Sequence, residues 1–140
     1  SHREIVVTAR RRSGQLIFTN ATIAGVRTSV IIDTGGELSI GNKALQRRLR
    51  LKSSAMVQTN LVDVTGRSVQ ADYGIAEELL IGRARFGIIP IAFADIAPFK
   101  ALKLDKSPAL FLGMDALRKF DRVAIDFANR KIYFLIPKDA

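Results

Sequence analysis

Hydrophobic and polar residues alternate along most of the chain, in short runs that are separated by turn-forming residues. This period of two is typical of half-buried β-strands, because successive side chains of a strand point to opposite faces of a sheet. The pattern therefore predicts a mainly β domain. The expected strands cover residues 4–9, 15–23, 26–32, 55–64, 68–75, 79–81, 85–93, 110–113, 122–127 and 131–136.

Turn and helix signals complete this prediction. Residues 10–14 end in Ser-Gly and are expected to form a turn, while residues 95–108 lack periodicity and are expected to form a surface loop. Asn42 can cap a short helix over residues 43–49, whose apolar side chains fall on one face. A second short helix is expected over residues 114–120.

Length and composition fit one compact domain. A chain of this size can bury about two thirds of the surface that its unfolded form exposes, and 48% of its residues are hydrophobic. We expect residues 1–14 to be a tag remnant and an edge strand, and residues 15–140 to form the functional domain. No apolar run approaches the roughly 18 residues of a membrane span. A soluble domain is expected, and its compartment stays open: a membrane anchor outside this sequence and a bacterial periplasmic location are both compatible.

The sequence excludes most familiar hydrolytic mechanisms. It contains no cysteine, so disulfides, thiolate catalysis and cysteine-based metal sites are ruled out. Its one histidine, His2, lies in the expected tag remnant and leaves no candidate for a histidine-based triad or a zinc site. No glycine motif for binding phosphate or a dinucleotide is present. We therefore expect no metal and no cofactor, and catalysis by carboxylates remains.

The triplet Asp33-Thr34-Gly35 is the candidate for that chemistry. It follows the apolar run at residues 30–32, which is expected to be buried on both faces of a sheet. A charge at the end of a buried strand is costly and suggests a purpose, although Asp, Thr and Gly are also common in ordinary turns. Gly35 lacks a side chain, so backbone amides can approach the carboxylate closely.

A mechanism based on paired aspartates would need a second copy of the chain, because the triplet occurs only once. Two carboxyl groups held about 3 Å apart cannot both ionise, so they share one proton. The ionised member can take a proton from water, and the protonated member can donate to the carbonyl oxygen of the bond being broken. The Thr34 hydroxyl could bond across the junction to the loop of the other copy.

Several landmarks, in order, resemble the retropepsin-type aspartic proteases and, within them, the single-domain bacterial members. They are the triplet at 33–35 with Ser39, a hairpin near Gly66, the sequence Phe-Leu-Gly at 111–113 leading into a helix, and Ile-Asp-Phe-Ala-Asn at 125–129. The resemblance covers roughly residues 15–136. It implies the retropepsin-like acid-protease fold, a closed barrel-like β domain with one or two short helices and one lobe per chain.

The resemblance also implies roles for individual residues. Asp33 would be catalytic, Thr34 would support the two-fold junction, and Gly35 would contribute backbone bonds to the carboxylates. Residues 63–70 would form a flap that closes over an extended peptide, as opposed to an ordinary solvent hairpin. The implied substrate-binding positions of the flap and the pocket floor are Gly36, Val64, Thr65, Gly66 and Arg67.

Two positions near the triplet need comment. The family more often has Ala or Ser where this chain has Gly36, which could loosen the loop or alter the pocket floor. Glu37 adds a carboxylate beside the site and is expected to point to solvent. Residues 111–113 would pack beneath the active-site loop and buttress it.

The strongly basic composition does not by itself indicate nucleic-acid binding. The formal net charge is +9 and the pI is about 10.5, but the basic residues lie in small scattered groups without interleaved aromatic residues. A protein that binds single strands combines such charges with stacking platforms. A solvated basic face is favoured, which could steer acidic protein segments or an anionic membrane surface towards the domain.

The sequence therefore predicts a homodimeric aspartic endopeptidase that hydrolyses extended protein segments at acidic to neutral pH, with no nucleic-acid partner. A catalytically silent dimeric module that holds a peptide on the same fold is the alternative, since a fold does not establish activity. A basic β domain that binds nucleic acid ranks last.

Overall fold

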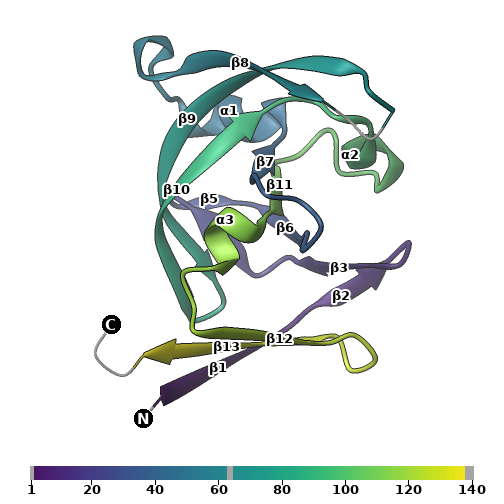
Figure 1. The fold of residues 1–140 in the computed structure, drawn as a ribbon, viewed down its shortest axis with the longest axis vertical. Helices are drawn as coiled ribbons and strands as arrows, with labels where there is room; N and C mark the ends of the chain where they lie inside the picture. Colours follow the sequence, from purple (N-terminus) through teal and green to yellow (C-terminus); the bar gives the residue numbers. More distant parts are fainter. Residues whose placement is uncertain (1, 63–64, 138–140) are drawn as a thin grey trace.

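The alternating segments form two antiparallel-rich sheets in a computed structural model, which describes residues 2–62 and 65–137 (Figure 1). The strands are β1 His2–Thr8, β2 Arg10–Arg12, β3 Gln15–Phe18, β4 Ala21–Ile23, β5 Val26–Arg27, β6 Ser29–Ile32, β7 Ile40–Gly41, β8 Val57–Val62, β9 Ser68–Ile81, β10 Ala84–Phe93, β11 Ala109–Leu112, β12 Arg122–Asp126 and β13 Lys131–Pro137. The helices are α1 Lys43–Leu49, α2 Ala97–Ala101, α3 Met114–Leu117 and the single-turn 3-10 helix η1 Ser53–Ala55.

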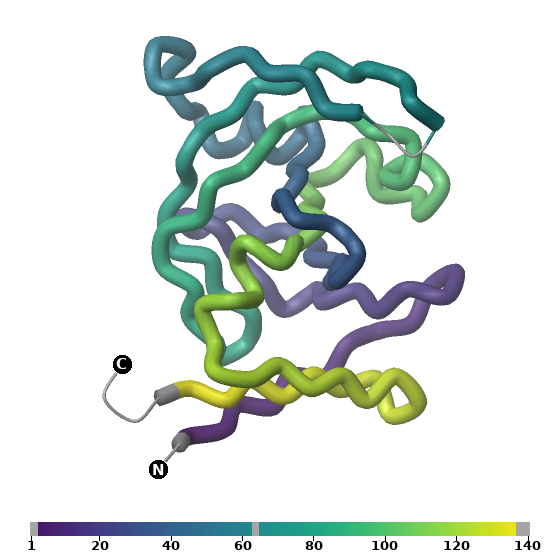
Figure 2. The backbone as a smooth tube through the Cα atoms, in the orientation of Figure 1, coloured from purple at the N-terminus to yellow at the C-terminus, as the bar shows by residue number. Residues whose placement is uncertain are grey.

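The larger sheet has ten strands in the order β2-β3-β6-β11-β7-β10-β9-β4-β5, and β8 pairs with β9 beside this path. The smaller sheet has the order β1-β13-β12 and carries the N-terminal strand at its edge. Figure 2 shows this smaller sheet at one end of the molecule and the β8–β9 hairpin at the other end. The two sheets and few short helices make the mainly β architecture that was predicted.

Strand β11 lies between β6 and β7, the two strands that flank the Asp33 loop. It pairs in parallel with β6, with Leu112 opposite Ile32, and antiparallel with β7, with Phe111 opposite Ile40. The loop therefore leaves and re-enters the sheet on either side of one buried strand. This arrangement confirms the expectation that residues 111–113 support the loop from beneath.

Strand β6 is buried on both faces, as its continuous apolar sequence predicts. Val30 belongs to the main core, which also contains Phe18, whereas Ile31 faces a second core beneath α2. Both Val30 and Ile31 are fully shielded from solvent. Burying a side chain of this size stabilises the fold by about 1.5–3 kcal/mol. The strand is thus a rigid base for the residue that follows it.

Five predictions of local structure were wrong. The expected strands at 15–23 and 26–32 are each divided, into β3 and β4 and into β5 and β6, by breaks at residues 19–20 and at Thr28. Arg10–Arg12 form strand β2, because the β2–β3 hairpin turns only at Ser13 and Gly14, whose φ angles are +48° and +76°. Residues 68–81 form one strand rather than two, since β9 continues through Glu78, at φ +64°, and its pairing with β10 contains register shifts. The expected loop at 95–108 contains α2, which is too short to show a helical period and is anchored by buried Phe99.

The helix ends differ less from the prediction. Helix α1 has the predicted bounds, and Asn42 caps it by accepting a hydrogen bond from the Leu45 amide. Helix α3 ends at Leu117, three residues before the predicted end at 120.

Helix α1 is tied to strand β9 by the carboxylate of Asp72. Its Oδ2 accepts hydrogen bonds from Gln46 Nε2 at 2.9 Å and from Lys43 Nζ at 3.0 Å. The bond from Gln46 and then the bond and charge of Lys43 lower the pKa of Asp72 below its usual value. Because the two donors come from one helix and the acceptor from the long strand, the ionised carboxylate holds these elements together.

We predict that Asp72→Asn removes a pH-dependent part of the stability. A carboxyl group whose pKa is lowered by folding stabilises the protein above its unfolded pKa of about 3.9, and this contribution is lost as the pH falls through the folded pKa. The free-energy difference between wild type and variant should be largest above about pH 5 and shrink towards pH 3. Urea unfolding at each pH measures it.

The matched control is Glu4→Gln, since Glu4 is exposed on β1 and forms no ion pair within the described ranges. A wild-type to Asp72→Asn difference that stayed constant from pH 7 to pH 3 would contradict the assigned role of the ionised group.

Candidate active site

Asp33 is the first residue of the loop that joins β6 to β7. Its backbone amide donates to the Leu112 carbonyl at 2.9 Å, and its own carbonyl accepts from the Gly36 amide at 3.3 Å. The Gly35 amide donates to Asp33 Oδ1 at 3.2 Å. Asp33 is half-buried, whereas Thr34 and Gly35 are exposed. Backbone bonds thus hold the carboxylate at the surface end of a buried strand.

Gly36 lies directly against that carboxylate. A Cβ atom built on Gly36 would be 2.7 Å from Asp33 Oδ2 and 3.2 Å from its Cγ. The first distance is too short for any real contact, so a side chain at residue 36 would displace the Asp33 carboxylate. Gly36 therefore permits the position that Asp33 has in this structure.

The loop rests on the start of α3 through its backbone. The Met114 amide donates to the Gly36 carbonyl at 2.8 Å, and the Asp115 amide donates to the Glu37 carbonyl at 2.9 Å. At Gly113 a Cβ would lie 2.4 Å from the Leu38 carbonyl oxygen and 2.7 Å from the Leu38 carbonyl carbon. The two backbones can approach this closely only because residue 113 has no side chain.

Ser39 links the same segments with its side chain. Its buried hydroxyl accepts from the Gly113 amide at 3.0 Å and donates to Asp115 Oδ1 at 2.8 Å. The sequence pointed to Ser39 as a landmark, but it did not reveal that Asp115 completes this network. A bond between residues 76 positions apart has no local signal.

Glu37 points to solvent, as expected, and pairs with Arg118, which follows α3. The Arg118 guanidinium donates to both carboxylate oxygens of Glu37, and both side chains are 59% exposed. These hydrogen bonds are the main cause that lowers the pKa of Glu37 and raises that of Arg118. The extra charge beside the triplet is therefore matched by a cation.

Asn42 follows β7 directly and holds the start of α1 against the segment that precedes β11. Its Oδ1 accepts from the Leu45 amide at 2.9 Å and from the Ala109 amide at 3.2 Å. Its Nδ2 donates to the carbonyls of Leu104 at 2.9 Å and Ser107 at 2.7 Å. One fully buried side chain therefore caps α1 and ties the segment before β11 to it. The helix-capping role was predicted, and the tertiary bonds were not.

The predicted flap residues lie in a separate hairpin. Strands β8 and β9 pair up to Val62 opposite Ser68, so Thr65, Gly66 and Arg67 belong to the connecting turn, in which Gly66 has φ +83°. All three are exposed, while Val64 lies outside the described residues. The structure brings Asp33, Thr34, Gly35 and Gly36 together in one loop and places the turn residues in another element.

The described part of the chain holds no group of three or more His, Asp or Glu residues positioned to bind a metal ion. None of its helices has the length and apolar character needed to span a bilayer. The site so described is the Asp33 carboxylate in a loop that contains Gly35 and Gly36, while the neighbouring carboxylates of Glu37 and Asp115 are bonded to Arg118 and Ser39.

The comparisons with known proteins agree with this geometry. The sequence profile of the family described as "Aspartyl protease" matches residues 19–116, which is more than half of the chain and includes the Asp33 loop. The chain belongs to this aspartyl protease family. Among solved structures it is similar to a retropepsin-like aspartic protease from Rickettsia conorii, with a TM-score of 0.68 and 21% sequence identity over 97% of this chain and 92% of that chain. The fold is therefore retropepsin-like. None of the curated proteins compared with the chain matches it.

We predict that Gly113→Ala destabilises the protein, because the new methyl group would meet backbone atoms of Leu38 that cannot rotate away. Overpacking of this kind costs about 1–3 kcal/mol. Urea unfolding measures the loss. Gly35→Ala is the matched control for stability, since its Cβ would have only one contact within 4 Å, at 3.6 Å. Equal stabilities for the two variants would show that β11 and the loop can separate without cost.

Proposed function

We propose that this chain is an aspartic endopeptidase that acts as a homodimer, with one Asp33 from each subunit and without a cofactor. One observation carries the proposal: a chain of the aspartyl protease family presents a single Asp-Thr-Gly carboxylate, held by backbone bonds at the end of a doubly buried strand. Its substrate class is an extended segment of a protein or peptide.

Hydrolysis follows from a pair of carboxyl groups that share one proton. The ionised Asp33 takes a proton from a water molecule, whose oxygen attacks the peptide carbonyl carbon. The protonated Asp33 of the other subunit donates its proton to the carbonyl oxygen, which gives a neutral tetrahedral intermediate. The Asp33 that took the water proton then gives it to the amide nitrogen, and the C–N bond breaks while a hydroxyl of the intermediate returns its proton to the other Asp33 and the carbonyl re-forms. The pair ends with one proton, as it began, and the pKa values belong to the pair rather than to either residue.

The loop geometry suits this role. In the described structure the Asp33 carboxylate accepts one intrachain hydrogen bond, from the Gly35 amide, so its second oxygen remains available to share a proton. Thr34 and Gly35 are exposed in the isolated chain, where they can meet the same residues of a partner. In this proposal Thr34 supports the two-fold junction and Gly36 forms the pocket floor.

The β8–β9 hairpin is proposed as the flap. A peptide in extended conformation can add main-chain hydrogen bonds as a further strand, and a closed hairpin would exclude water from the reaction. Val64, Thr65, Gly66 and Arg67 would contact the substrate from this side. The exposed turn with its positive-φ glycine is compatible with such a movement.

Asp33→Asn should abolish peptide cleavage, because the amide can neither take a proton from water nor share one with the partner carboxylate. General acid–base groups contribute about 10²–10⁴-fold, so a loss of at least a hundredfold is expected. Cleavage of a peptide library, read by mass spectrometry at several pH values, tests this. Glu4→Gln is the control, since Glu4 is exposed on β1 and lies outside the Asp33 loop. Unchanged cleavage by Asp33→Asn would reject the assignment, and a wild type that binds peptides without cutting them would indicate the silent module.

Activity should also depend on dimer formation. Dilution below the dissociation constant of the dimer should make the specific activity fall in proportion to protein concentration, because a monomer holds half a site. Adding excess Asp33→Asn protein to the wild type should then inhibit it, since mixed dimers carry one carboxylate. Analytical ultracentrifugation at the assay concentrations gives the oligomeric state. Full turnover by a demonstrated monomer would contradict the shared site.

A further inference from the structure

Five exposed cations gather at the edge of the larger sheet, on β2 and on the segment from α2 to β11. They line adjoining hollows whose described lining includes one acidic residue, Asp105. We call this surface the basic rim, and it consists of Arg10, Arg12, Lys100, Lys103 and Lys106. The side chain of Arg12 joins its two parts by donating to the Leu102 carbonyl at 3.1 Å.

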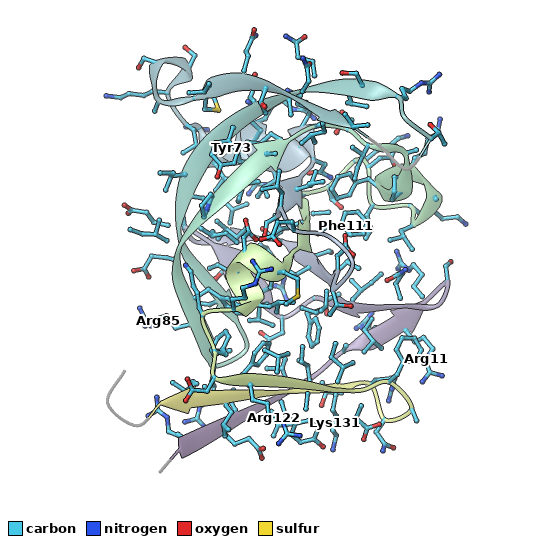
Figure 3. All side chains as sticks on the ribbon, viewed as in Figure 1. Arg11, Tyr73, Arg85, Phe111, Arg122 and Lys131 are labelled. Carbon is cyan, nitrogen blue, oxygen red and sulfur yellow. The ribbon has the colours of Figure 1, made fainter. Side chains whose placement is uncertain are left out.

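Arg11 also lines one of these hollows, but it is not counted in the rim because its guanidinium is engaged by the β12–β13 turn. Its guanidinium donates to the Phe127 carbonyl at 2.6 Å and lies 5.1 Å from the centre of the Phe127 ring. Successive residues of a strand point to opposite faces, so Arg10 and Arg12 face the side opposite to Arg11. Figure 3 shows Arg11 close to the β12–β13 turn, at the side away from α2.

The register of the sheet places the rim near Asp33. Arg10 pairs with Ile17, and Ile17 pairs with Ile31, two residues before Asp33. Two strand spacings of about 4.8 Å and two residues of about 3.3 Å put the Arg10 and Asp33 Cα atoms roughly 12 Å apart. An extended peptide covers that distance in about three or four residues.

The rim also lies on the sheet face that α2 covers. Ile17 and Ile31 both belong to the second core, together with Phe99, Leu102 and Leu104 of the α2 segment. In Figure 1 the β2–β3 turn and α2 project on the same side of the molecule as the loop that follows β6. A peptide seated at Asp33 and running towards this edge would therefore meet the rim.

The rim differs from the other basic residues in that its charges are gathered. Within the described ranges none of its five cations forms an ion pair, which is also true of isolated exposed cations such as Arg48, Arg83 and Arg122, but the five line adjoining hollows. Gathered like charges repel one another, and an anionic group seated among them relieves this repulsion. The hollows have no aromatic residue among their lining, so they offer no stacking platform for nucleobases. The chemistry fits carboxylate side chains of a peptide.

We propose that the basic rim selects substrates that carry Asp or Glu about three or four residues from the scissile bond. This inference rests on the proposed function, because it takes the bond to be cut at Asp33. In a symmetric dimer the same preference would apply on both sides of the bond. The rim then sets which segments are cut, and the Asp33 pair cuts them.

Matched peptides test the preference directly. A peptide that the wild type cuts is made with Asp or Glu at these positions and, as its pair, with Asn or Gln. Each exposed ion pair improves binding by about two- to fivefold, so two contacts should raise kcat/KM of the acidic peptide about 4- to 25-fold. The advantage should diminish in 0.5 M salt, since salt at roughly that level screens exposed charges. Equal kcat/KM values for acidic and amide peptides would overturn the proposal.

A rim variant and a charge-matched control locate the effect. The rim variant combines Arg10→Gln, Lys103→Gln and Lys106→Gln and keeps Arg12, whose hydrogen bond to Leu102 supports the loop. The control combines Arg48→Gln, Arg83→Gln and Arg122→Gln, three exposed residues outside the rim. The rim variant should lose the acidic preference and retain cleavage of the amide peptide, while the control retains both. The same preference in both variants would overturn the assignment.

Binding to the Asp33→Asn protein separates this proposal from the proposed function. Suppose that the wild type cuts no peptide, but that the acidic peptide binds more tightly than its amide pair and only the rim substitutions remove this difference. The rim would then be a binding site for acidic peptides, and the proposed protease function would fail. Equal binding overturns the rim proposal alone. A single-stranded oligonucleotide is the competing probe. If the rim variant no longer binds the oligonucleotide but still prefers the acidic peptide over the amide peptide, the rim is a site for polyanions and does not select peptides.

Discussion

The insertion of β11 between β6 and β7 is the constraint on which the rest of the structure depends. It gives the Asp33 loop a buried strand beneath it, with a hydrogen bond from the Asp33 amide to Leu112. The close approach of Gly113 to the Leu38 backbone is possible only without a side chain. Position and orientation of the carboxylate are therefore set by main-chain packing, which is stiffer than any single side-chain contact.

The polar side chains around the Asp33 loop have hydrogen-bond partners within the described structure. Ser39 and Asp115 bond each other, and Glu37 is matched by Arg118. Asp33 accepts one hydrogen bond in the described chain and keeps capacity for another partner. In the proposed enzyme this remaining capacity serves the Asp33 of a second subunit, because each chain contributes one carboxyl group of the pair.

The basic residues of the whole chain also divide into those that form ion pairs and those that do not. The cations beside β9 and α3 have acidic partners, whereas those at the β2 edge have none in the described structure. The net charge of +9 is therefore not spread evenly over the surface. Five of the cations without an ion pair in the described chain gather on the sheet edge that the pairing register connects to Asp33, while others, such as Arg48, Arg83 and Arg122, are scattered over the surface. This distribution links the general basicity of the chain to the substrates it would select.

The sequence by itself determined the elements whose signals are local. The period of two predicted the strands, the run at 30–32 predicted burial on both faces, and Asn42 predicted the start of α1. The Asp-Thr-Gly landmarks indicated the family that the sequence profile shows. The sequence did not predict helix α2, because a helix of five residues is too short to show a helical period. It also did not predict that β9 is continuous, because the irregular pairing with β10 interrupts the alternation of apolar and polar residues.

Only the tertiary structure decided which distant residues meet. The bond from Ser39 to Asp115, the three tertiary bonds of Asn42 and the place of Arg10 beside the second core depend on strand order and register. A sequence pattern reports which face of an element is buried, but not which element covers it. That choice arises from the packing of all strands at once, which is why the site could be located from the sequence and its supports could not.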